Sequence, residues 1–146
     1  PGHTGAPGEP TCHACHNDLQ LNEPGGRLEV VDFPEEYTGG QAYVVSLVLN
    51  SDEMATSGFQ AAVSGGSLIP VDDKTVVLSD SVGRKYIGHS PQGANPMTPS
   101  RMLWTFEWIA PSEAGAGVSL SAAANSGNGD NSPMGDFIYT VQAQSR

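Results

Sequence analysis

The feature that most constrains the fold is a repeated alternation of apolar and polar residues, in short runs that Gly, Pro, Asn and Asp interrupt. Gln41–Asn50 is rich in β-branched and aromatic residues, which strands favour. Four large side chains alternate with smaller or charged ones in Arg101–Ala110 and share one face: Met102, Trp104, Phe106 and Trp108. This period of two predicts β-strands, and it predicts Arg101–Ala110 as a central core strand.

Six further windows show the strand pattern: Arg27–Phe33, Gly58–Ser64, Lys74–Asp80, Gly83–Gly88, Gly117–Ala124 and Asp136–Ala143. No window has the period of a long amphipathic helix. The 18 Gly and 11 Pro suit many tight turns, and 146 residues suffice for one core. We therefore predict an all-β domain over residues 27–146, an immunoglobulin-like antiparallel β-sandwich of seven to eight strands.

Residues 1–26 form a different segment, an irregular arm rich in Pro-Gly turns. It holds the chain's only two cysteines in the pattern Cys12-His13-Ala14-Cys15-His16, and C-x-x-C-H attaches a c-type haem. The two thiols form thioethers to one porphyrin, and the histidine becomes the proximal iron ligand. The arm is therefore predicted to carry one covalent haem c on Cys12 and Cys15, with His16 on the iron.

Three other interpretations of the same cysteines stay open. Cys12 and Cys15 could close a small disulfide, or they could supply half of a zinc site. Zinc needs two further ligands, and no second C-x-x-C or H-x-x-x-H pair is present. A thioredoxin-like redox pair is the third interpretation, but such pairs follow a strand, and nothing before Cys12 has a strand pattern.

The sixth iron ligand must come from another His or Met. His89 is the first candidate, because it ends a predicted strand and precedes a loop rich in Pro and Gly. His3, on the same arm, is the second candidate, and Met97 is the third. His13 lies between the cysteines and is poorly placed to reach the same iron, and the alternation assigns Met102 to the core.

Several short motifs occur in order along most of the chain: Thr4-Gly5-Ala6-Pro7-Gly8-Glu9 before the haem motif, Tyr37-x-Gly39-Gly40, Gly58-Phe59-Gln60, Tyr86-Ile87-x-His89, Phe106-x-Trp108-x-Ala110-Pro111, Ala123-x-Asn125 and Gly135-Asp136-x-Ile138-Tyr139. Together they resemble bacterial secreted domains related to the reeler domain, of the choice-of-anchor V type. The resemblance implies an extracellular immunoglobulin-like sandwich with an N-terminal C-x-x-C-H segment. It also implies that His89 falls on a family motif.

The charge of the chain narrows its partners and its location. There are 6 Lys and Arg against 16 Asp and Glu, a net charge of −10, so neither nucleic acid nor an anionic membrane surface is an expected partner. No stretch approaches the ~20 apolar residues of a membrane span. The chain starts at Pro1 without a methionine, and haem c is attached outside the energy-transducing membrane. We expect an exported protein that is periplasmic, cell-surface or extracellular.

The first functional hypothesis is an exported monohaem c-type cytochrome in electron transfer, with other cytochromes or redox proteins as partners and no catalytic role. Self-association into a filament with stacked haems is expected to extend the reach of one haem. The alternative is a structural or adhesive surface protein in which the haem or a metal acts as a staple. A third hypothesis is a five-coordinate haem enzyme or sensor.

A further loop, Asn125–Asn131 with Asp136 beyond it, carries many side-chain oxygens. It could hold Ca²⁺, although its spacing departs from the known D-x-D-x-D-G loop and an ordinary Gly/Asn turn is favoured.

Overall fold

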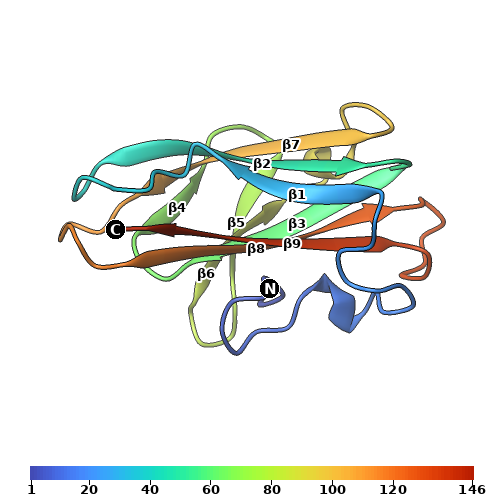
Figure 1. Cartoon of the computed structure of the whole chain (residues 1–146), viewed down its shortest axis with the longest axis horizontal. Coiled ribbons are helices and arrows are strands. Elements are labelled where there is room, and N and C mark those ends of the chain that lie inside the picture. The colour runs from blue at the N-terminus through green and yellow to red at the C-terminus, as the bar shows by residue number, and fades with distance from the viewer.

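The computed structural model describes all 146 residues as two antiparallel sheets packed face to face (Figure 1). The four-stranded sheet has the order β1 (Gly26–Val31), β2 (Ala42–Ser51), β7 (Arg101–Ile109) and β4 (Ser67–Pro70). The five-stranded sheet has the order β5 (Thr75–Ser79), β6 (Lys85–His89), β3 (Thr56–Val63), β8 (Val118–Gly127) and β9 (Phe137–Ser145). The predicted all-β sandwich is confirmed.

The strand count is nine rather than the predicted seven to eight. Each predicted window contains one strand, and the additional one is β4, which pairs with β7 at the edge of its sheet. β4 has four residues and ends at Pro70, so it is too short to display an alternation. Proline is tolerated there because an edge strand leaves one side of its backbone unpaired.

The core lies between the two sheets and contains the large side chains of β7. Met102, Trp104, Phe106 and Trp108 are all 0% exposed. The indole of Trp104 donates to Gly93 O at 2.8 Å, so its one polar atom is satisfied in the interior. Each such large side chain stabilises the fold by roughly 1.5–3 kcal/mol when fully buried. The assignment of Met102 to the core is confirmed.

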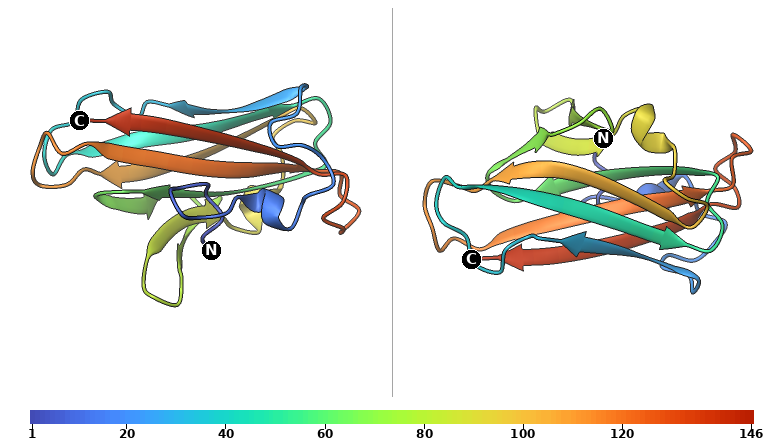
Figure 2. Two further views of the ribbon diagram at one scale, coloured as in Figure 1. Left: turned by 60° about the horizontal axis from the view of Figure 1, so that its bottom comes forward. Right: turned by 90° about the horizontal axis from the view of Figure 1, so that it is seen from above.

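The N-terminal arm lies on the outer face of the five-stranded sheet, away from β2 and β7 (Figure 2). His3 N donates to Gln60 Oε1 of β3 at 3.3 Å. The Tyr86 hydroxyl of β6 donates to Glu9 Oε1 at 2.6 Å. The arm leads into β1 at Gly26, and hydrogen bonds join it to the five-stranded sheet at several points.

Helical structure is confined to two single turns, η1 (Cys12–Ala14) and η2 (Gln92–Ala94). Neither turn has the length and apolar character needed to cross a membrane.

Candidate functional site

The cysteines and His16 are held together by the single turn η1. Thr11 caps it, since its Oγ1 accepts from His13 N at 3.2 Å. The amides of Cys15 and His16 both donate to Cys12 O, at 3.2 and 3.1 Å. The C-x-x-C-H spacing therefore folds as one tight local turn of the backbone.

The two thiols are free and lie in different environments. Cys15 is exposed, whereas Cys12 is half-buried with Sγ 3.9 Å from His3 O. Burial raises the pKa of the Cys12 thiol to about 11, so this thiol stays protonated at neutral pH. A reactive redox pair needs a lowered thiol pKa, so the structure gives no support to the thioredoxin-like interpretation.

The zinc interpretation also lacks a ligand set. No group of three or more His, Cys, Asp and Glu side chains is placed to bind a metal ion. A tetrahedral structural zinc takes four such ligands from the protein.

His16 lies against the buried carboxylate of Asp136, the residue that directly precedes β9. Its Nδ1 is buried and lacks a well-aligned hydrogen-bond partner, and Asp136 Oδ2 is 2.8 Å away. A small rotation of the ring would bring the two into a hydrogen bond. Asp136 is 4% exposed, and its other oxygen accepts from Asn128 N at 3.1 Å. Metal-bound histidines are commonly oriented by a carboxylate on the second ring nitrogen, and Asp136 occupies that position.

His89 ends β6 and is exposed. Its Nδ1 is 3.0 Å from Phe59 N and 3.2 Å from Phe59 O on the neighbouring strand β3. Phe59 N donates to Nδ1 at 3.0 Å, which in a neutral ring puts the proton on Nε2. In the other tautomer Nδ1 donates to Phe59 O, and the lone pair is on Nε2, which has no hydrogen-bond partner in the protein. That second tautomer is the one that can bind a metal through Nε2.

Gly58 provides the space beside the His89 ring. A Cβ atom at this position would fall 2.7 Å from His89 Cε1 and 2.6 Å from Asn125 Oδ1. Asn125 lies opposite Gly58 on β8, and it lines a polar cavity of about 350 Å³ together with His16. His16 and His89 therefore both lie at the end of the β3–β8 pair that contains Asn125.

The other histidines and methionine considered as iron ligands lie in the arm and in the loop before β7. His3 is beside Cys12 and is bonded through its amide to Gln60, two residues along β3 from Gly58. It therefore remains the second candidate. His13 Nε2 is 2.7 Å from Leu19 O within the arm, in agreement with its exclusion. Met97 is 57% exposed in a loop bonded to Arg101, and it makes no hydrogen bond with the arm.

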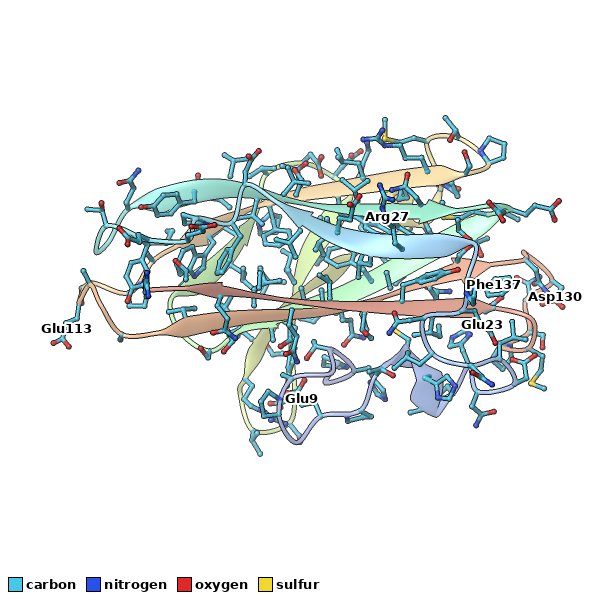
Figure 3. The ribbon with its side chains drawn as sticks, viewed as in Figure 1. Glu9, Glu23, Arg27, Glu113, Asp130 and Phe137 are labelled. Carbon is cyan, nitrogen blue, oxygen red and sulfur yellow. The ribbon has the colours of Figure 1, made fainter.

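The loop that was considered for Ca²⁺ uses its oxygens internally. Asn128 Oδ1 accepts from Asp130 N at 3.0 Å, and Asp130 Oδ1 accepts from Ser132 N at 2.7 Å. Figure 3 labels Asp130 at the outer end of this loop, beyond Phe137 at the start of β9. Such side-chain bonds to the backbone two residues on are typical of Asx turns, so the favoured interpretation as a Gly/Asn turn fits the geometry.

Two residues of this centre were not predicted as site residues. The sequence places Asp136 beyond a loop considered for Ca²⁺ and in a family motif, and nothing local connects it with His16. Gly58 falls in a predicted strand and in a family motif, although a glycine inside a strand often marks a close approach of another group.

Solved structures with a similar fold include the reelin-N domain of F-spondin, 18% identical with a TM-score of 0.54, covering 87% of this chain and 90% of that one. A cohesin module from a Clostridium perfringens family 33 glycoside hydrolase is 14% identical with a TM-score of 0.53, covering 84% and 96%. A type II cohesin domain from the cellulosome of Acetivibrio cellulolyticus is 11% identical with a TM-score of 0.53, covering 84% and 95%.

No family model and no curated protein matches this chain. The structural likenesses establish a β-sandwich of the reeler and cohesin kind, which agrees with the fold implied by the sequence resemblance. At these identities they establish the fold alone.

Proposed function

We propose that this chain is an exported c-type cytochrome that carries one covalent haem on Cys12 and Cys15 and works in electron transfer. One observation supports it most strongly. His16 lies beside the Asp136 carboxylate and lines the same polar cavity as Asn125. His89 lies beside Gly58, the residue that Asn125 faces across β3 and β8. Both imidazoles lie at the same end of the β3–β8 pair, where they would serve as ligands of a haem iron.

The haem would supply reversible one-electron chemistry, and the protein residues fix its environment. Cys12 and Cys15 would hold the haem through thioethers, and His16 and His89 would be the protein ligands of its iron. Two histidine ligands from the protein favour electron transfer over catalysis. Two histidines also give a lower reduction potential than one histidine and one methionine, because a thioether raises the potential.

The net charge of −10 points to the kind of redox partner. An acidic surface attracts a partner with a positive patch and speeds their encounter at low ionic strength. We therefore propose a basic cytochrome or redox protein as the electron donor or acceptor.

The direct test is expression in a host that attaches haem c, followed by a pyridine haemochrome spectrum and the mass of the intact protein. We expect one haem per chain and a low-spin spectrum. A protein that remains colourless, with unmodified thiols, would contradict the proposal.

Single histidine variants then identify the sixth ligand. His89→Ala should give a high-spin haem that binds carbon monoxide, whereas His13→Ala should keep the low-spin spectrum because His13 contacts only the arm. A low-spin His89→Ala protein together with a high-spin His3→Ala protein would transfer the role to His3.

A further inference from the structure

The strand β5 leaves one side of its backbone unpaired, because it lies at the edge of the five-stranded sheet and bonds only with β6. The β5–β6 hairpin projects from the body of the sandwich (Figure 2). Val76 and Val77 of β5 are each 38% exposed. An exposed, β-branched edge strand is a template for pairing with another strand.

The hydrogen bonds at the two ends of β5 define which residues face the open edge. Lys74 O accepts from Ser90 N, and Asp80 N donates to Arg84 O, so both residues direct these groups toward β6. Backbone direction alternates along an antiparallel strand. Thr75, Val77 and Ser79 therefore direct their N–H and C=O groups to the open edge.

The sequence of this segment is chemically symmetric about Val77. It reads Lys74-Thr75-Val76-Val77-Leu78-Ser79-Asp80. In an antiparallel pair of two copies centred on Val77, Lys74 faces Asp80 at both ends. Thr75 then faces Ser79, and Val76 faces Leu78, so each cross-strand pair is complementary.

We infer that two copies of this chain associate through β5, antiparallel and with the two-fold axis at Val77, so that their five-stranded sheets become one continuous sheet. The residues that face the open edge are those that this register pairs by hydrogen bonds. Sliding one copy by two residues keeps the backbone pairing, but it places Lys74 opposite Leu78 or Val82 and loses both charge pairs.

The charges around β5 agree with this register. Lys74 makes no ion pair within the chain, although four of the other five cationic Lys and Arg side chains bond to an acidic or hydroxyl side chain. Asp80 and Glu9 both form ion pairs with Arg84, whose Nη1 is 3.2 Å from Glu9 Oε1. This group of two carboxylates and one guanidinium has a net charge of −1, and it would accept the ammonium of Lys74 from the second copy.

The first experiment is sedimentation velocity of the haem-loaded or haem-free chain over a range of concentrations. We expect a monomer–dimer equilibrium. Lys74→Glu sets a carboxylate opposite Asp80 twice and should weaken dimerisation roughly tenfold or more. Arg101→Glu is the matched control, because it makes the same charge change at an exposed residue of β7 and should leave dimerisation unchanged. Equal weakening by both variants, or a monomer throughout, would overturn the inference.

The second experiment tests the register by disulfide cross-linking. In the proposed pair, Val77 faces itself at about 5.5 Å between Cα atoms, which a disulfide can bridge. Val77→Cys should therefore cross-link under mild oxidation, with a 77–77 linkage in the peptide map. Val76→Cys and the more exposed Val82→Cys should link far less, and equal yields at all three positions would contradict this register. The inference does not depend on the haem, so its failure would leave the proposed cytochrome intact.

Discussion

At the scale of single residues, the candidate site depends on groups beside the ligands as much as on the ligands. Asp136 is a buried carboxylate with His16 as its only ionisable partner. When a carboxylate accepts from the ring nitrogen that does not bind the metal, the imidazole becomes a stronger ligand, and it favours ferric over ferrous iron. Asp136 is therefore expected to lower the reduction potential of a bound haem.

Asp136→Asn tests that effect in the haem-loaded protein. We expect the midpoint potential to rise, by roughly 60 mV if the carboxylate favours ferric iron tenfold. Asp130→Asn is the control, since it removes the same charge from an exposed residue of the same loop. Redox titration measures both, and equal shifts would mean that only net charge matters.

Gly58→Ala tests the space beside His89. The added methyl group would lie 2.7 Å from His89 Cε1, so the ring must move and lose its bond with Phe59. We expect a high-spin haem in a protein that keeps its β-sheet circular dichroism. Gly117→Ala is the control, because nothing lies within 4 Å of its Cβ, and it should stay low-spin. An unchanged spectrum for Gly58→Ala would argue against His89 as a ligand.

At the scale of elements, the arm depends on the sheet for its position. Tyr86 of β6 is 1% exposed and donates to Glu9 Oε1, which also lies near Arg84. This buried contact joins the arm to a strand far along the chain. Because the cysteines are in the arm and His89 ends β6, the same contact helps to fix the position of the cysteines relative to His89.

Tyr86→Phe removes this contact with little change of shape. Loss of a hydrogen bond to a charged group costs roughly 1.5–3 kcal/mol, and the arm should open more often. Hydrogen exchange of the amides of Gly5 and Glu9, which are protected by bonds within the arm, should accelerate. Tyr43 lies in β2 of the other sheet, and its hydroxyl accepts from Thr38 N, so Tyr43→Phe should leave those amides unchanged.

At the scale of the whole molecule, stability is expected to fall at alkaline pH. Burial, followed by the hydrogen bond to Glu9, raises the pKa of Tyr86 to about 12, against an ordinary value of 10. The folded chain thus keeps a proton that the unfolded chain loses. The stabilisation is complete below pH 10 and disappears as the pH rises from 10 to about 12.

Urea unfolding at pH 8, 10 and 11.5 measures this loss. The midpoint should decrease across the series, and Tyr86→Phe should show a smaller decrease. In the haem-free chain, Cys12 adds a second component with the same sign, because its pKa is raised to about 11. Thioether formation would remove that component. A Tyr86→Phe protein with an undiminished pH dependence would contradict the assignment.

The proposed pairing through β5 also limits the assembly of the molecule. A two-fold contact uses the same patch on both copies and closes after two of them. A filament with stacked haems therefore needs a second contact elsewhere on the surface, and it stays a prediction that electron microscopy can test.

The sequence by itself determined the strands that contain a clear alternation, such as β2 and β7, and the spacing of Cys12, Cys15 and His16 in the arm. Both signals are local, because a period of two and a three-residue spacing act through neighbouring residues. Only the tertiary structure revealed β4, the approach of Asp136 to His16, and the position of His89 beside Phe59 and Gly58. Those contacts depend on which strands pair, in which register and around which core, and residues far apart in the chain acquire these relations only when the two sheets pack.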